Sequence, residues 1–153
     1  MSGGLFGSLG ISASGMSADR LRMDVTAENL ANADTTQGAN GQPYQRKEVV
    51  LSEINGGSSF AAQLAGAQSG MADSQSVGSG VQVSGIINDP SPPIMKYDPG
   101  NPDANAQGYV AMPNVNPVTE MVDLITASRG YEANVQAMNA AKQMFSRTLD
   151  LLR

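Results

Sequence analysis

Two long stretches almost free of helix-breaking residues, one near each end of the chain, constrain the fold most strongly. Residues 16–32 contain neither glycine nor proline, and residues 118–152 contain only Gly130. Between them, residues 33–115 hold 11 of the 17 glycines and 7 of the 8 prolines. Because glycine and proline interrupt helices and favour turns, the chain divides into two helical ends and a turn-rich middle.

The N-terminal stretch carries apolar side chains at alternating spacings of three and four residues, which is the period of one helix face. Several glycines precede residue 12, so we expect a regular helix only from about Ser12. We predict that residues 1–32 form one helix. Its assembly seam is assigned to Leu9, Met16, Leu21, Met23, Val25 and Leu30.

The C-terminal stretch predicts a longer helix over residues 116–153. Asn116 is a favoured N-cap residue, and Pro117 suits the first helical position. The apolar spacing of three and four residues then continues over more than four heptads, as in coiled coils. At 1.5 Å per residue, such a helix is about 54 Å long. Its assembly seam is assigned to Met121, Leu124, Tyr131, Val135, Met138, Phe145, Leu149 and Leu152.

The middle segment, residues 33–115, contains β-like runs bounded by turn residues. These runs are Tyr44–Leu51, Val81–Ile87, Pro93–Tyr97 and Gly108–Met112. Residues 55–80 have few large apolar groups and one charge, so we predict a flexible loop there. The fold class that follows is mainly α with a small β part, in which the two terminal helices form an α-helical coiled coil around the middle segment.

The terminal helices have more apolar surface than one hairpin covers. Docking them on each other buries one seam apiece but leaves a second, small-residue stripe on the C-terminal helix uncovered. That stripe consists of Ala133, Ala137, Ala140 and Met144. Packing between molecules would cover it, so the pattern favours assembly. A monomeric two-helix hairpin with a β cap remains the alternative, because such stripes are often simply core.

Composition excludes most catalytic chemistry. The chain has no histidine and no cysteine, so it lacks an imidazole base, a thiolate nucleophile and the usual zinc ligands. Its 14 carboxylates are scattered, and we interpret them as a solvated surface. The loop at 101–112 alternates oxygen-bearing side chains as an EF-hand does, but Ala106 and Met112 replace the required glycine and glutamate. We expect no enzyme activity, no metal and no cofactor.

The charge and hydropathy of the chain also limit its partners. A formal net charge of −5 argues against binding nucleic acid or an anionic membrane. No run approaches the roughly 18 apolar residues that span a bilayer, so we expect no membrane insertion. The start of the chain does not resemble a cleaved secretory signal, and no motif indicates a small-molecule substrate.

One short motif at the end of the N-terminal helix resembles the signature of bacterial flagellar axial proteins. It consists of Asn29, Leu30, Ala31, Asn32 and Ala33. Further stretches along the chain narrow the resemblance to the flagellar basal-body rod proteins, closest to those of the proximal rod. These stretches are Pro43–Lys47, Asp89–Pro92, Tyr97–Val110, Pro113–Asn116, Glu120–Ile125 and Ala127–Val135.

This resemblance implies a structural role in the bacterial flagellum. Such a protein leaves the cell through the flagellar type III export apparatus without a cleaved signal. It polymerises with itself and with other proximal and distal rod subunits into a periplasmic drive shaft, which transmits torque from motor to hook and is needed for motility. The helices would form the inner coiled-coil tube. The alternatives are a different flagellar axial protein or a cytoplasmic coiled-coil adaptor.

One position departs from the pattern that the resemblance implies. Gly130 stands in the Ser-Arg-Gly-Tyr stretch where such proteins usually have alanine. Glycine inside a helix costs about 1 kcal/mol relative to alanine. We therefore expect the C-terminal helix to be less rigid at this residue.

Overall fold

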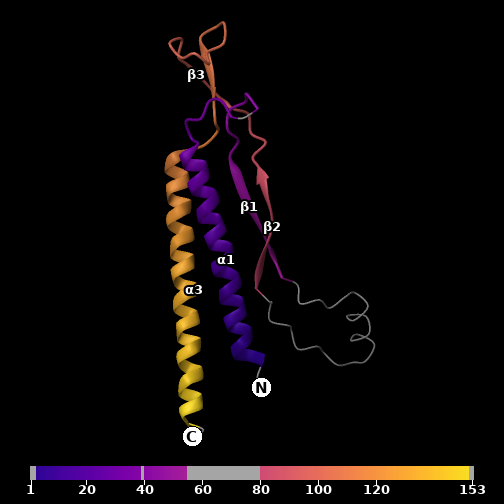
Figure 1. Cartoon of the computed structure of the whole chain (residues 1–153), viewed down its shortest axis with the longest axis vertical. Coiled ribbons are helices and arrows are strands. Elements are labelled where there is room, and N and C mark those ends of the chain that lie inside the picture. The colour runs from indigo at the N-terminus through magenta and orange to yellow at the C-terminus, as the bar shows by residue number, and fades with distance from the viewer. Residues whose placement is uncertain (1–2, 39, 55–79, 152–153) are drawn as a thin grey trace, which may run out of the picture.

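The computed structural model describes residues 3–38, 40–54 and 80–151, with the side chains of 3–6 and 151 left out. Two long helices lie side by side, and two strand pairs extend from the segment between them (Figure 1). The fold is therefore mainly helical, with two helical ends as the spacing of glycine and proline predicts, and small antiparallel strand pairs lie in the middle. The described residues contain no helix apolar and long enough to cross a bilayer.

Helix α1 runs from Gly3 to Ala31. It begins nine residues before Ser12, so the early glycines do not interrupt it. At its end the backbone N–H of Asn32 donates to the carbonyl of Glu28 at 3.1 Å, and the Asn32 side-chain amide donates to the same oxygen at 2.9 Å. The Glu28 carbonyl thus accepts two hydrogen bonds from Asn32, which closes the end of the helix.

Helix α3 runs from Pro117 to Leu151. The side-chain oxygen of Asn116 accepts hydrogen bonds from the backbone N–H groups of Val118 at 3.0 Å and Thr119 at 3.4 Å. Asn116 is thus the N-cap and Pro117 the first helical residue, which confirms the start that the sequence predicts. The helix passes through Gly130 without a break.

Strands β1 (Lys47–Glu53) and β2 (Val81–Asn88) form an antiparallel pair with a bulge between Val50 and Leu51. The far end of this pair is closed by a 2.9 Å hydrogen bond from the Ile54 N–H to the carbonyl of Gly80. The same end of the strand pair contacts α1, because the Val81 N–H donates to the Ser14 hydroxyl at 3.2 Å. Gly80 has a φ of +111°, and a Cβ there would lie 2.3 Å from that hydroxyl oxygen, so only glycine fits.

Strands β3 (Ile94–Tyr97) and β4 (Tyr109–Met112) form the second antiparallel pair, at the top of Figure 1. The rings of Tyr97 and Tyr109 meet edge to face with centroids 5.2 Å apart. Together, the four strands confirm the β-like runs that the sequence predicts. The loop predicted over residues 55–80 lies outside the described residues, except for Gly80.

The two helices run antiparallel and contact each other through small side chains. The most buried apolar residues on them are Ala18 and Val25 in α1 and Ala127 and Ala141 in α3, with exposures of 1–5%. Small residues let two helices approach closely. The core is consequently a narrow seam between the helices and extends to Val110 and Val115 above them.

Candidate functional site

Five polar side chains meet where α1 ends, β1 begins and α3 begins, and we call this cluster the polar joint. Its members come from three segments far apart in the sequence. They are Asn29, Tyr44, Arg46, Lys47 and Glu120. The cluster ties the two helices to the strand pair at one point.

Asn29 is at the centre of the polar joint and is 1% exposed. Its side-chain amide donates to the Lys47 carbonyl at 2.9 Å and to a Glu120 carboxylate oxygen at 3.0 Å. Its side-chain oxygen accepts from the Tyr44 hydroxyl and from the Lys47 N–H, each at 2.9 Å. Both donors and both acceptor positions of the amide are thus used. The motif at residues 29–33 therefore begins with a residue that organises the fold.

Glu120 is also 1% exposed, which corrects our interpretation of the carboxylates as solvated surface. Its other carboxylate oxygen accepts a hydrogen bond of 2.6 Å from Nε of Arg46. This bond, followed by the nearby carboxylate charges, raises the pKa of Arg46. The Arg46 guanidinium also lies 3.7 Å from the carboxylate of Asp123. A buried carboxylate needs such a partner, because burial without one is strongly unfavourable.

Tyr44 and Lys47 complete the polar joint toward solvent. Burial, with smaller contributions from the negative charges of Glu28 and Glu120, raises the pKa of Tyr44 to about 12. The Lys47 ammonium forms an ion pair with Glu28 and lies 5.9 Å from the centroid of the Tyr44 ring. Tyr44 therefore stays protonated, and it donates its hydrogen bond to Asn29 throughout the physiological pH range.

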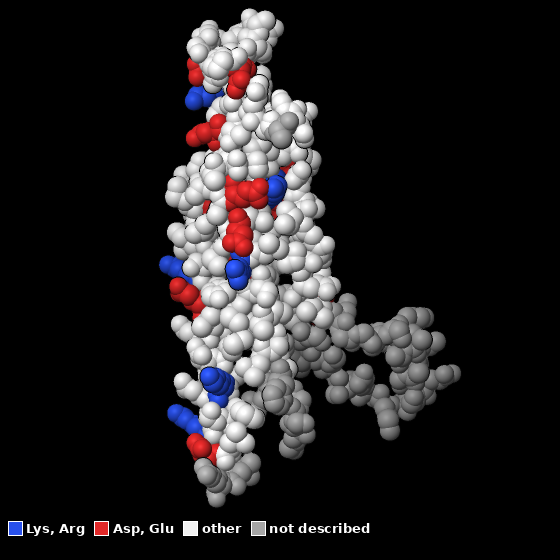
Figure 2. Space-filling model, viewed as in Figure 1, with Lys and Arg blue, Asp and Glu red and all other residues white. Residues whose placement is uncertain are grey.

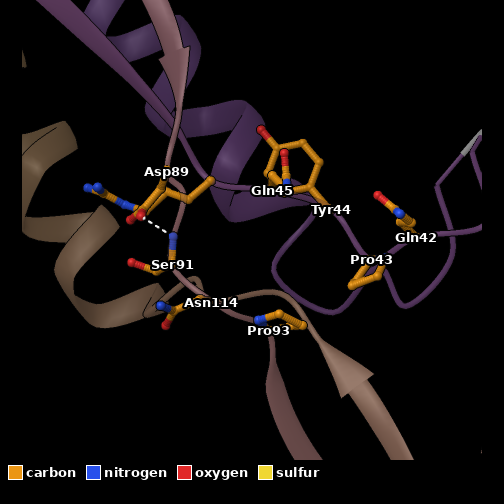
Figure 3. Close-up of a pocket in the computed structure, with 9 residues that line it drawn as sticks. Gln42, Pro43, Tyr44, Gln45, Asp89, Ser91, Pro93 and Asn114 are labelled. Carbon is orange, nitrogen blue, oxygen red and sulfur yellow. Dashed lines mark hydrogen bonds between the residues drawn. The ribbon is translucent and has the colours of Figure 1, made fainter.

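Beside the polar joint lies a surface hollow of about 270 Å³ at the base of the β3–β4 pair (Figure 3). Tyr44 borders one side, and Pro93 and Asn114 border the other. On its rim the Ser91 N–H donates to the Asp89 carboxylate at 2.8 Å, and hydrogen bonding from Ser91 lowers the pKa of Asp89. The described residues contain no group of three potential metal ligands, either here or elsewhere.

The alternating oxygens of the loop at 101–108 are engaged in turns. The side-chain oxygen of Asn101 accepts from the Asp103 N–H at 3.0 Å, and that of Asn105 accepts from the N–H groups of Gln107 and Tyr109, each at 2.9 Å. The Asp103 carboxylate accepts from the Thr36 hydroxyl at 2.7 Å. The bonds accepted by Asn101 and Asn105 are side-chain-to-backbone turn bonds, in agreement with the turn interpretation of this loop.

The residues assigned to the N-terminal seam differ in burial. Val25 is 5% exposed, and the other five are half-buried. Those five are Leu9, Met16, Leu21, Met23 and Leu30. Within the motif that follows, Asn29 is buried and belongs to the polar joint, Asn32 closes the end of α1, and Ala31 is exposed. The seam itself stays a prediction, because a single chain does not reveal contacts between molecules.

The residues assigned to the C-terminal seam fall into two groups. Half-buried positions occupy the central part of α3: Leu124, Tyr131, Val135 and Met138. More exposed positions lie toward its ends: Met121 at 50%, Phe145 at 39% and Leu149 at 52%. Leu152 lies outside the described residues. Whether these side chains line an assembly seam likewise stays a prediction.

Sequence reasoning missed Glu120 as a member of the buried face, although one signal was present. Glu120 precedes Leu124 by four residues and Ala127 by seven, so it shares their side of the helix. Its place in the first turn of α3 also suits the helix dipole. The helix dipole alone explains a glutamate in the first turn even if it is exposed. The burial of Glu120 was therefore not predicted.

Gly130 lies at a close approach of the two helices. A Cβ at this residue would lie 2.9 Å from a carboxylate oxygen of Asp19, and one at Gly15 would lie 2.8 Å from the amide nitrogen of Asn134. Asp19 and Asn134 are themselves joined by a hydrogen bond of 3.2 Å. The glycine that we expected to weaken the helix therefore makes room for a polar contact between α1 and α3.

Comparison with known proteins gives matches at both helical ends. Residues 9–39 match the family described as "Flagella basal body rod protein", and residues 106–151 match "Flagellar basal body rod FlgEFG protein C-terminal". Similar curated proteins share the description "Flagellar basal-body rod protein FlgC". The one from Bacillus subtilis is 50% identical over 95% of this chain and 97% of its own length. That from Yersinia enterocolitica is 45% identical over 92% of each chain, and that from Borreliella burgdorferi is 39% identical over 98% and 99%.

Proposed function

The chain belongs to the FlgC family of flagellar basal-body rod proteins, and from this premise we propose that it is a structural subunit of the rod that builds the rod through its terminal helices. Its role is structural and depends on the packing of its terminal helices against neighbouring subunits. The middle segment would face outward, and the polar joint would hold it at a fixed angle to the helix pair.

One observation carries this proposal: α3 keeps seven large apolar side chains exposed by 39–68%. They are Val118, Met121, Val122, Ile125, Met144, Phe145 and Leu149. They fall into two groups, one at each end of α3, and exposed apolar patches of this kind mark sites of association. A rod subunit would cover them with its neighbours.

The helices would pack in the assembled rod as a coiled coil. The half-buried and exposed apolar residues assigned above to the two seams would then be covered by helices of adjacent copies. Formal charges support close packing, because residues 116–153 carry four acidic and four basic side chains. Segments without net charge can crowd together without strong mutual repulsion.

The same family relationship supports a proposal for the position in the flagellum. We assign the chain to the proximal rod, where it would contact itself and other rod subunits and transmit torque from motor to hook. Export would proceed through the flagellar type III apparatus without a cleaved signal, which places the protein outside the cytoplasmic membrane. A strain that lacks the protein would then be non-motile.

The test is complementation of such a strain, with the protein content of purified basal bodies as the readout. We expect the wild-type chain to restore motility and to be recovered in basal bodies. Met138→Asp should be expressed but fail to assemble, because it places a charge in the seam. Gln136→Asp, an exposed position two residues away, is the matched control and should assemble.

Two results would contradict the proposal at different levels. If the wild-type chain remained in the cytoplasm and was missing from basal bodies, the rod function would be wrong and the adaptor alternative would take its place. A motile Met138→Asp strain with normal rods would instead leave the rod function intact and refute the seam assignment.

A further inference from the structure

The first turns of α3 carry an apolar surface that faces away from α1. It comprises four side chains that are each at least 50% exposed: Val118, Met121, Val122 and Ile125. We call these residues the outward patch. Val118 precedes the buried Glu120 by two residues, so it points about 200° away from it around the helix. In Figure 2 the surface over the first turns of α3 is mostly white. The spacing of the four residues, i, i+3, i+4 and i+7, is the spacing with which a helix anchors in an apolar groove.

A groove of about 250 Å³ lies between the helix pair and β1, at the level of these turns. It has an apolar wall formed by Val25 of α1 and by Val49 and Leu51 of β1, and Leu51 is 37% exposed. Arg22 of α1 and Asp123 of α3 also line it. We call it the side groove. Its apolar wall can take up apolar side chains from another molecule, because their burial there removes apolar surface from water.

The outward patch and the side groove lie on opposite sides of α3. Asp123 lines the groove, and Ile125 follows it by two residues, so the two side chains point about 200° apart. Both surfaces occupy the same turns of the helix, because Asp123 lies between Val122 and Ile125 in the chain. One copy cannot place its own patch in its own groove. Two copies that lie side by side can join the patch of one to the groove of the other.

Charged side chains beside the two surfaces are weakly paired within the chain. At the side groove, Arg22 and Asp123 have ion-pair partners only at 4.0 Å and 3.7 Å, near the 4 Å limit of such pairs. Beside the outward patch, Arg129 and Glu132 are exposed, and no ion pair between described residues includes either of them. Each surface therefore offers one positive and one negative charge to a partner.

These charges are complementary when the α3 helices of two copies run parallel. Arg129 and Glu132 lie about 60° apart around α3, one toward each edge of the outward patch. With the patch in the side groove, Glu132 lies on the α1 side and faces Arg22 of the other copy. Arg129 then lies on the α3 side and faces Asp123. Opposite charges attract across an interface, whereas like charges disfavour it. Turning one copy end for end would place Glu132 on the side of Asp123, so the charges favour a second, parallel copy of this chain as the occupant.

We propose that, in the assembled rod, the outward patch of one copy packs in the side groove of the next copy, with the two α3 helices parallel. This inference rests on the proposed function and specifies a contact that it leaves open. The contact places Ile125 of one molecule against Leu51 of its neighbour, and Glu132 against Arg22. Contact between two different surfaces of identical chains is heterologous and repeats from copy to copy into a ring or a helical row. Because the two surfaces lie at one level, this row runs around the rod.

The chain contains no cysteine, which allows a direct crosslinking test. A disulfide needs Cα atoms within about 7 Å, whereas in the described part of the chain no Cα of β1 lies within 8 Å of a Cα of α3. Any bond between a cysteine in β1 and one in α3 must therefore join two molecules. A Leu51→Cys/Ile125→Cys variant would be assembled into basal bodies and oxidised, and we expect a ladder of covalent multimers of this chain. Val49→Cys/Val122→Cys tests the same contact if the first variant fails to assemble.

Two kinds of control follow from the geometry. Leu51→Cys/Gln136→Cys keeps an exposed position on the same side of α3 as Ile125 but moves it by 11 residues, about 16 Å along the helix, so no ladder is expected. The single variants Leu51→Cys and Ile125→Cys should stay monomeric, because in a heterologous contact neither surface meets its own copy.

Charge reversal tests the pairing of Arg22 with Glu132 independently. Arg22→Glu and Glu132→Arg should each lower the recovery of the chain in basal bodies, because each places like charges together. The double variant should restore the recovery. Equal recovery of all these chains, or no restoration in the double variant, would contradict the pairing.

The outcomes of the crosslinking test separate this inference from the proposed function. Double-cysteine variants that enter basal bodies but stay monomeric, or that link to a different protein, would overturn the inference and leave the rod function standing. Absence of the wild-type chain from basal bodies would instead overturn the proposed function.

Discussion

The side-chain amide of Asn29 donates a hydrogen bond of 3.0 Å to the carboxylate of Glu120, 91 residues away along the chain, and both side chains are 1% exposed. This bond joins the last turn of α1 to the first turn of α3. Because Glu120 also binds Arg46, the same two residues fix the start of β1. The buried contact between Asn29 and Glu120 thus fixes the position of the strands relative to the helix pair.

Replacing Asn29 by alanine should lower the free energy of unfolding by about 3 kcal/mol, because the carboxylate of Glu120 and the backbone groups of Lys47 lose buried hydrogen bonds. Urea unfolding of the purified chain measures this change. Asn88→Ala is the control, since that amide makes only one exposed bond, of 3.3 Å to Gln45. Its effect should stay below about 0.5 kcal/mol. Equal effects of the two substitutions would contradict the role of the polar joint.

Tyr44 should make the fold sensitive to strong alkali. Its pKa is about 12 in the folded chain and about 10 in an unfolded one. The protonated phenol is therefore favoured by folding, so its stabilising contribution is complete below pH 10 and is lost as the pH rises toward 12. The difference in tyrosinate absorbance between wild type and Tyr44→Phe should show a step near pH 12. A step near pH 10 would contradict the buried environment.

Gly130→Ala should not give the gain in stability that helix propensity alone predicts. An added Cβ would displace the Asp19 carboxylate and strain its bond to Asn134. We expect this strain to cancel most of the roughly 1 kcal/mol advantage of alanine. In an Asp19→Ala background the obstacle is gone, and the same substitution should stabilise by about 1 kcal/mol. A double-mutant cycle measures the difference, and additive effects would contradict the close approach.

Residues 55–79 should be replaceable by a two-residue Asn-Gly turn. Ile54 and Gly80 are already joined by a 2.9 Å backbone hydrogen bond, and the neighbouring residues Glu53 and Val81 are paired in the ladder. A tight type I′ turn fits this geometry, and a shorter connection reduces the entropy of loop closure. The shortened chain should be at least as stable as the full chain in urea unfolding.

The control for this replacement also removes Ile54. That deletion shifts β1 by one residue and turns its side chains to the wrong face, so the free energy of unfolding should fall. A large loss of stability in the first variant as well would indicate that residues 55–79 contribute contacts of their own.

The secondary structure could be predicted because its signals are local. The Asn116 cap, the apolar spacing of α3 and the turn residues around the four strands each act within a few residues of the chain. The beginning of α1 was misjudged, since the low helix propensity of its glycines is a weak preference that a long helix overrides. Both helices and the four strands were otherwise expected, whereas the pairing of the strands was not predicted.

The polar joint was much harder to predict. Arg46 and Glu120 are 74 residues apart, and although Glu120 shares a helix face with Leu124 and Ala127, no local signal identifies Arg46 as its partner. The same holds for Gly130, whose role depends on Asp19 across the helix interface. A sequence pattern reports the face on which a side chain lies, whereas the partner that it meets there is decided by how whole elements pack.

The position of the polar joint also determines which part of the molecule unfolds locally first. The joint lies at the closed end of the helix pair, and beyond Ala18 and Ala141 no described helix side chain is fully buried. Local opening is easiest where few side chains are buried. The start of α1 and the end of α3 should therefore separate before the helix ends at the polar joint. The part of the molecule around the polar joint can then keep its shape while these ends open.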